Sequence, residues 1–402
     1  MAVTGTADLV QSLKEVVDVT YDLAVPLNYV YAQPPITQVP AGGVLAPGSR
    51  WSSLAIPFYS PLVPANTARS EIADIAAVAL EDSEVTITPS LYGNAVQLSL
   101  ALQKRATPDV MRVASQLISE NAGKSIDFLA RTAAVGGRGV TYGIGSSRDA
   151  VTSAGQLTDL LLNTAAAYLS GAPRLAGGGR GLAAIMRNVV VTDLAETASI
   201  ILVGQNRDVI EPILLGEVGQ MISGVRIIES EHAKVFHGAG ASLAMTTENI
   251  SAAAAAGQTT LGINTVGASD VGAYPTLGTR ESTANGENAR VETIFVSSGA
   301  GTSAYGIVGG GPNGGLVYSY SSGTALDSFT QVHAVVVCGA DAIMKVYASD
   351  IGPDGEVLPW DNDGLLGQFD SLSWRWFGGF GIKAQNRVYR LDVGAARPVL
   401  GI

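Results

Sequence analysis

The longest periodic stretch of the chain spans residues 107–135. Thr107-Pro108-Asp109 supplies a hydroxyl N-cap, a proline at the first helical position and an acid that complements the helix dipole. Gly136-Gly137 ends the pattern. The stretch predicts one helix of about 27 residues, roughly 40 Å long. Its apolar positions recur at roughly helical spacing, at Val110, Val113, Leu117, Ala122, Ile126 and Leu129.

Residues 50–103 carry a strand pattern. Apolar side chains alternate there, and therefore line one face, at Val96, Leu98, Leu100 and Leu102. Prolines at Pro57, Pro61 and Pro89 keep much of the region away from the centre of a sheet. The pattern predicts a protruding hairpin of two long strand segments rather than a compact domain.

The chain before this hairpin is predicted to be an arm. Residues 7–18 have the pattern of a short amphipathic helix, and a stretch rich in proline and glycine follows to about Ser49. This extended stretch has few core-forming residues, so we expect it to lie on another element.

The chain after the long helix alternates between shorter patterns. A second helix is predicted over residues 154–170, and a third helix begins at Thr192. A strand is predicted between them at residues 187–191, after a glycine-rich loop. Two long strand stretches are predicted at 332–343 and 371–393.

Residues 237–330 differ from the rest in composition. They are rich in glycine, alanine, serine and threonine, and their two basic residues are Arg280 and Arg290. Strand pairs are predicted within them at VETIFVS (291–297) and GLVYSYSS (315–322). We expect an inserted lobe that is mostly β-structure or irregular.

Composition limits the class of protein. The chain has 402 residues, of which 47% are hydrophobic and 15% charged, enough for cores in two or three domains. It has no run of eighteen apolar residues, so no membrane association is expected, and its first residues lack the pattern of a secretory signal. The single cysteine, Cys338, excludes intrachain disulfides and is expected to be a buried, inert thiol.

Charge is distributed unevenly along the chain. The net charge is −11, which disfavours nucleic-acid binding through a global positive field. Residues 104–190 nevertheless hold ten bases against five acids, whereas residues 1–103 hold three bases against nine acids. A positive middle beside acidic ends indicates complementary faces within or between copies, although solvated surface charge is the commoner explanation.

Three short strings have the letters of binding motifs. GGGPNG (309–314) matches a dinucleotide fingerprint, but no helix follows, so a hairpin turn is expected. Gly123-Lys124-Ser125 resembles the end of a phosphate loop, yet it falls inside the long helix. DNDGLLGQFD (361–370) has calcium-loop offsets, but its first ligand position is Pro359, so a turn is favoured over a cation site.

The sequence yields no candidate catalytic, cofactor-binding or metal-ligating residue. His232, His237 and His333 are dispersed without metal spacing, and no serine, histidine and aspartate order suggests a triad. An enzyme is therefore not expected.

Four stretches together resemble the major capsid proteins of tailed bacteriophages, which have the Hong Kong 97-type fold. PSLYGNAVQLS (89–99) is similar to the motif that leaves the extended loop of that family. GEVGQMISGVRIIES (216–230) resembles its signature turn and strand. AVVVCGADA (334–342) and DGLLGQFDSLSWRWFGGFGIKAQNRVYRLDV (363–393), with Trp374-Arg375, are similar to its closing strands. The matching stretches span about 45–236 and 331–395.

The resemblance implies an α+β fold with a defined division of the chain. In order, it implies an N-terminal arm at 1–44, an extended loop at 45–103, a peripheral domain with the spine helix at 104–154, an axial domain at 155–340 that includes the insertion 237–330, peripheral return strands at 341–378, and an axial C-terminal strand at 379–402. In the turn and strand, Gly216, Gly219 and Gly224 would permit tight turns, and Val225 and Ile227 would pack inward.

The resemblance also implies function and partners. Copies of the chain would form hexamers and pentamers in an icosahedral shell around double-stranded DNA, in a virion made in the host cytoplasm. A portal protein, and scaffolding or decoration proteins, would be further partners. Neighbours would cover the arm and hairpin and share strands with them. Two alternatives use other classes of protein: an encapsulin-type nanocompartment shell, and a surface adhesin rich in glycine and serine.

Overall fold

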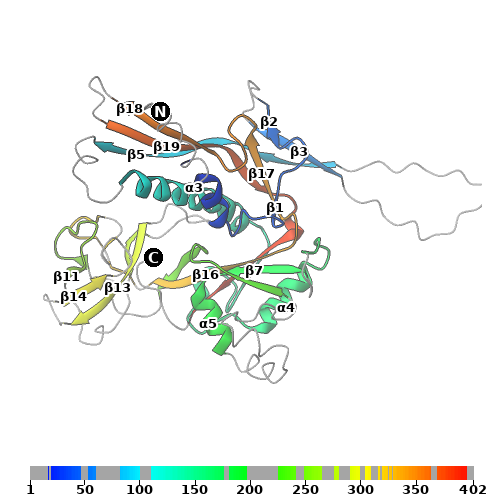
Figure 1. The fold of residues 1–402 in the computed structure, drawn as a ribbon. Coiled ribbons are helices and arrows are strands. Elements are labelled where there is room, and N and C mark those ends of the chain that lie inside the picture. The colour runs from blue at the N-terminus through cyan, green and yellow to red at the C-terminus, as the bar shows by residue number, and fades with distance from the viewer. Residues whose placement is uncertain are drawn as a thin grey trace, which may run out of the picture. The chain divides into compact units, whose positions relative to one another are not determined.

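The computed structural model is an α+β protein that divides into two compact units (Figure 1). The first unit comprises Met1–Ala133 and Ile343–Lys383, and the second comprises Ala134–Ala342 and Ala384–Ile402. The structure describes residues 17, 20–46, 53–59, 82–99, 110–175, 181–196, 225–240, 249–264, 276–279, 290–298, 304–308, 316, 319–324, 326–327, 329–363 and 369–395.

The predicted long helix is confirmed as α3 (Val110–Val135). Its N-cap residues, 107–109, lie outside the described part of the chain. The buried face is a stripe with a spacing of four residues, formed by Ala114, Ile118, Ala122, Ile126, Ala130 and Ala134. The predicted face was wrong at Val113 and Leu117, which are 46% and 57% exposed. Alanines set this face because small side chains let neighbouring elements approach the helix closely.

The first unit contains a six-stranded sheet with β19 (Phe369–Ile382) at its centre. The strand β19 pairs antiparallel with three other strands of the sheet, β5 (Ser90–Ser99), β17 (Ile343–Ala348) and β18 (Glu356–Asp363). Two short strands of the arm, β1 (Thr37–Gln38) and β2 (Val44–Leu45), pair parallel with β17. The arm therefore continues the sheet of its own chain.

The predicted hairpin is present as β3 (Leu54–Tyr59) and β4 (Asp82–Ile87), which pair antiparallel along their whole length. The strand β5, which lies within the predicted region 50–103, pairs with β19 from Ser90 to Ser99 and is not part of the β3–β4 pair. Within the predicted alternation Leu98 is buried and Val96 half-buried, whereas 100 and 102 lie outside the described residues.

The arm is more ordered than its sequence predicts. Residues 20–27 are helical, although an extended stretch was predicted to follow residue 18. Most of the predicted helix at 7–18 falls outside the described residues. Figure 1 shows this short blue helix beside α3. The prediction that the arm lies on another element is confirmed. Its buried side chains include Tyr21, Val25, Tyr31 and Ile36.

The second unit is built on a mixed six-stranded sheet. The order is β6-β20-β16-β7-β8, and β9 also pairs with β16. The strands are β6 (Val140–Tyr142), β7 (Leu182–Met186), β8 (Val225–Glu229), β9 (Val235–Gly240), β16 (Phe329–Cys338) and β20 (Val388–Val393). The predicted long strands at 332–343 and 371–393 are thus present as β16 and as β19 with β20. A short 3-10 turn, η4 (Gln385–Arg387), precedes β20.

Two helices pack on this sheet, and both differ from their predictions. The helix α4 (Asp159–Tyr168) begins at its N-cap Thr158, whose hydroxyl accepts from the Leu161 amide. It is therefore shorter than 154–170. The helix α5 (Asn188–Glu196) replaces the strand predicted at 187–191, and the actual strand, β7, precedes it. A further 3-10 turn is η1 (Arg148–Ala150).

The predicted β-rich lobe is confirmed as a second six-stranded sheet in the second unit. Its order is β10-β11-β14-β13-β12-β15. The strands are β10 (Asn249–Ile250), β11 (Thr260–Asn264), β12 (Thr276–Thr279), β13 (Arg290–Ser298), β14 (Ala304–Val308) and β15 (Leu326–Asp327). It has a core of its own, which contains Ile250, Leu261, Ile263, Leu277 and Ile294.

The limits of the lobe are narrower than 237–330, because β9 and β16 pair with each other in the main sheet. VETIFVS is a strand as predicted, in β13. The strand predicted over GLVYSYSS was wrong where residues are described, since only Tyr320 makes a bridge there, to Ala254.

Candidate functional site

The stretches 89–99 and 363–393, which carried the resemblance, meet on α3. The Asn121 side-chain oxygen accepts from Trp374 Nε1 at 3.0 Å and from Asn94 Nδ2 at 3.3 Å. Trp376 is fully buried and stacks on Tyr92, with 5.9 Å between ring centroids. One carboxamide and one aromatic pair therefore join the spine helix, β5 and β19.

A polar cluster holds the arm to the turn between β17 and β18. The Tyr29 hydroxyl donates to Asp354 Oδ1 at 3.0 Å, and Lys345 Nζ donates to the same oxygen at 3.0 Å. The Tyr21 hydroxyl donates to the Asp354 carbonyl at 2.9 Å. Burial lowers the pKa of Lys345, although Asp354 opposes this shift. Burial, and then the Asp354 carboxylate, raise the pKa of Tyr21 and Tyr29 above the ordinary value.

The second unit contains a buried ionic network. Asp392 is fully buried and lies 2.9 Å from Arg390 Nε and 3.4 Å from Arg148 Nε. Arg390 also donates to the Val135 carbonyl through Nη1. The Arg148 guanidinium lies 3.5 Å from the centre of the buried Phe236 ring. Burial lowers the pKa of Arg390. The network ties β20 to η1 and to Val135, the last residue of α3.

Four basic residues of the positive middle were singled out by charge. Arg112 and Arg138 are exposed, whereas Lys124 and Arg131 are half-buried. The Arg131 guanidinium lies 4.5 Å from the centre of the Phe128 ring. Their partner, whether DNA or an acidic segment of a neighbour, stays a prediction.

Of the three binding-motif strings, the described part of the chain contains one in full. Gly123-Lys124-Ser125 lies inside α3, as expected. GGGPNG, and residues 364–368 of the calcium-like string, lie outside the described residues. Asn362 of β18 pairs with Asp370 of β19, so the ends of that string form a strand pair. Among the residues that the structure describes, no group of three or more His, Cys, Asp or Glu side chains is placed to hold a metal ion.

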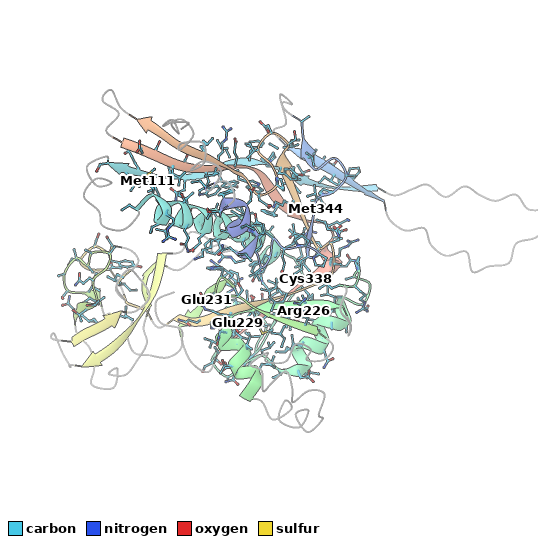
Figure 2. All side chains as sticks on the ribbon, in the orientation of Figure 1. Met111, Arg226, Glu229, Glu231, Cys338 and Met344 are labelled. Atoms are coloured by element: carbon cyan, nitrogen blue, oxygen red, sulfur yellow. The ribbon has the colours of Figure 1, made fainter. Side chains whose placement is uncertain are left out.

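The strand β16 carries both a buried histidine and the single cysteine. His333 is buried, and Cys338 is buried at the end of the strand (Figure 2). Burial raises the pKa of Cys338 to about 12, so the thiol stays protonated and unreactive, as predicted. Val225 is fully buried and Ile227 packs against the same core, which confirms their inward orientation, whereas 216–224 lie outside the described residues.

Large apolar side chains are exposed on the first unit. Leu23 and Leu27 of the arm helix are 66% and 84% exposed, and Leu91 of β5 is 65% exposed. Val113 and Leu117 on α3 are exposed as well, at 46% and 57%. Sequence periodicity missed these positions because it assigned Val113 and Leu117 to the core.

Comparison with known proteins identifies the fold. No protein-family profile matches the sequence, and no curated protein is similar to it in sequence. The solved capsid of cyanophage Pam1 matches 92% of this chain and 93% of its own chain, with a TM-score of 0.54 and 13% identity. The chain has a tailed-phage capsid fold.

A second capsid gives the same result. The acid-stable capsid of Helicobacter pylori bacteriophage KHP30 matches 88% of each chain, with a TM-score of 0.50 and 9% identity. The Hong Kong 97-type fold expected from the four sequence stretches is therefore confirmed. No helix in the described segments is long and apolar enough to cross a membrane.

Proposed function

We propose that the chain is a major capsid protein, which self-assembles into the icosahedral shell around the double-stranded DNA of a tailed phage. The observation that carries the proposal is the match over nearly the whole length of a phage capsid chain, with 92% of this chain covered. The match also covers 93% of that capsid chain, so the two chains correspond over nearly their whole lengths and not over a single domain.

The exposed surfaces support self-association. The hairpin β3–β4 is a two-stranded sheet, and an isolated pair of strands is only marginally stable in water. The exposed leucines Leu23, Leu27 and Leu91 offer apolar area to a neighbour. In a shell of hexamers and pentamers each copy makes several such contacts, so each contact can be weak.

The same proposal divides the chain into the parts of a shell subunit. We assign residues 1–44 to the arm, 45–103 to the extended loop, and 104–154 with 341–378 to the peripheral domain. Residues 155–340 and 379–402 form the axial domain. The lobe is an insertion in this domain, and the sequence resemblance to capsid proteins does not cover it.

The role is structural and not catalytic. The clusters of ionisable groups in the described residues, around Asp354 and around Asp392, are each held by internal bonds that fix the fold. The partners of the chain are further copies of itself, a portal protein, packaged DNA, and scaffolding or decoration proteins. The protein is made in the host cytoplasm and ends in the virion.

Electron microscopy of the purified protein tests the proposal. Negative staining should show closed shells of uniform diameter formed by this chain, alone or with a co-expressed scaffolding protein. Nuclease treatment of particles from infected cells should leave a protected genome. Fibres, or discrete small oligomers under every assembly condition, would contradict the proposal.

A further inference from the structure

One face of α3 carries two residues that are unusual inside a long helix. Gly123 and Asp127 lie one turn apart and are both buried. Glycine costs a helix interior about 1 kcal/mol relative to alanine, and a buried carboxylate needs hydrogen-bond donors. Both positions contact the arm segment, residues 20–46.

Gly123 lets the arm approach the helix closely. A Cβ atom built at this position would lie 2.7 Å from the Val25 carbonyl oxygen and 2.9 Å from Asn28 Cβ. The first of these is a backbone atom, so rotation of a side chain could not relieve the overlap. The arm helix occupies space that any other residue at 123 would fill.

Asp127 binds the next turn of the arm. Its Oδ1 atom accepts three consecutive backbone amides, from Val30 at 2.9 Å, Tyr31 at 2.7 Å and Ala32 at 2.9 Å. Tyr31 and Ala32 are buried, so water cannot replace the carboxylate as the acceptor of their amides. Amides that lose their acceptor in a buried position strongly favour local opening.

We propose that Gly123 and Asp127 form a seat that latches the arm onto its own subunit before assembly. The arm then continues through β1 and β2, which pair with β17 of the same chain. This differs from the expectation that neighbouring subunits cover the arm. The seat holds residues 20–32 in place on the subunit, and thereby positions the arm for contact with a second copy.

Two variants disturb the seat by different physical routes. Gly123→Ala removes the space for the arm, yet raises the intrinsic preference of α3 for helix. Asp127→Asn keeps the side-chain shape but removes the charge that attracts three amides. Ser125→Ala is the matched control, because the Ser125 hydroxyl donates to the Asn121 carbonyl within α3. Asp127→Ala is a fourth variant, in which no acceptor remains.

Hydrogen exchange on the unassembled subunit is the direct readout. The amides of residues 30–32 should exchange about ten- to a hundredfold faster in both seat variants and in Asp127→Ala, and at the parent rate in Ser125→Ala. Amides of β19 should keep parent protection in every variant. Parent-like protection of residues 30–32 in the seat variants would overturn the latch. Loss of β19 protection alongside them would also overturn it, because the seat would then be inseparable from the fold.

The role in assembly rests on the proposed function and is measured separately. Particle yield by electron microscopy should fall at least tenfold in Gly123→Ala and Asp127→Asn relative to Ser125→Ala. A normal yield from a variant with a released arm would show that the latch does not position the arm for assembly. A parent protein that forms no shells would instead contradict the capsid function, and the exchange result would still decide the latch.

Discussion

Tyr29 and Tyr21 show how single residues set the response of the fold to pH. Both hydroxyls donate to Asp354, one to its side chain and one to its carbonyl. Burial, together with that carboxylate, makes the phenolate form unfavourable, so the pKa of each tyrosine lies above its ordinary value of 10.0. In the unfolded chain each hydroxyl ionises near its ordinary value.

Alkaline pH should therefore destabilise the first unit. Below about pH 10 the tyrosines are protonated in both states and their contribution is fully present; it is lost as pH rises further. Above about pH 10, each tyrosine should lower the free energy of unfolding by about 1.4 kcal/mol per pH unit. The lowered pKa of Lys345 has the opposite effect on stability. Its contribution to the free energy of unfolding rises with pH until the pH reaches the ordinary lysine pKa of 10.5.

Denaturant unfolding of the parent and Tyr29→Phe between pH 8 and about 12 isolates this effect. The stability advantage of the parent should be constant below pH 10 and shrink above it. An advantage independent of pH over this range would show that Tyr29 ionises equally in both states.

Buried and exposed ion pairs should differ in their contribution to stability. Arg390→Leu leaves the fully buried Asp392 with only Arg148 nearby, at 3.4 Å, and should cost about 3–5 kcal/mol. Arg375→Leu breaks a pair with Glu356 whose side chains are 47% and 39% exposed, and should cost below about 1 kcal/mol. Thermal unfolding of the two variants gives the comparison, and equal losses would contradict the assigned roles.

Single residues were the hardest feature to predict from sequence. Asp127 is one more polar residue on an amphipathic helix until the arm, some 96 residues earlier in the chain, is placed against it. Gly123 suggested a failed phosphate motif, yet its cause is the close approach of Val25. Both roles depend on long-range contacts, which periodicity does not encode.

Secondary-structure elements were predicted well where one periodic pattern extends over many residues. The helix α3 was found within three residues of both ends, and β13, β16 and β19 were found as strands. The prediction of a strand at 187–191 was wrong because it rested on three valines, whose preference for strands is small and depends on their packing. Val190, Val191 and Leu194 instead have helical spacing and are buried against the sheet.

Residues 60–81, which connect β3 to β4 along the chain, should be required for shell assembly but not for folding. Tyr59 and Asp82 pair directly, so a two-residue Asn-Gly turn can replace residues 60–81 and close the hairpin. Deletion of the whole stretch 50–103 is a poorer test, because it removes β5 from the central sheet. The shortened protein should keep the unfolding temperature of the parent and form no stable particles by electron microscopy. Intact shells from this variant would contradict the role of the hairpin.

The lobe should accept inserted peptides at one turn and reject them in a strand. Gly323 has a φ of +82° in a turn, and a Cβ built there meets no atom within 4 Å. Gly278 lies within β12 and pairs with Val291 of β13. A short epitope tag after Gly323 should leave soluble yield and thermal unfolding unchanged, whereas the same tag after Gly278 should lower both. Equal tolerance at the two sites would show that the sheet of the lobe is dispensable.

At the scale of the whole molecule, the composition of the loop bears on how a shell is held together. Some capsids of this fold join subunits through a loop lysine and an asparagine of a neighbour. The six lysines of this chain are Lys14, Lys104, Lys124, Lys234, Lys345 and Lys383, and none lies within 45–103. Arginine does not replace lysine in such chemistry, because its guanidinium stays protonated.

We therefore expect a shell without covalent cross-links. Mature particles boiled in detergent should give a single band at the monomer mass of 41.2 kDa. A ladder of heavier covalent species would show that a lysine outside the loop supplies the nucleophile.

The positive middle of the chain should act in assembly or packaging. Charge reversal at two exposed bases, Arg112→Glu with Arg138→Glu, should reduce particle yield or the amount of packaged DNA, because the charge distribution predicts an acidic partner for these bases. Particle counts and DNA content per particle are the measurements. Parent values for both would show that the charges are merely solvated.

Cryo-electron microscopy of assembled particles tests the central claim most directly. The account predicts a closed icosahedral shell whose wall is built from hexamers and pentamers of this chain. Density for each copy should follow α3, the hairpin and the three six-stranded sheets, with residues 20–46 on their own subunit. Particles whose wall is formed by another protein, or preparations in which this chain forms only open fibres or small oligomers, would contradict the account.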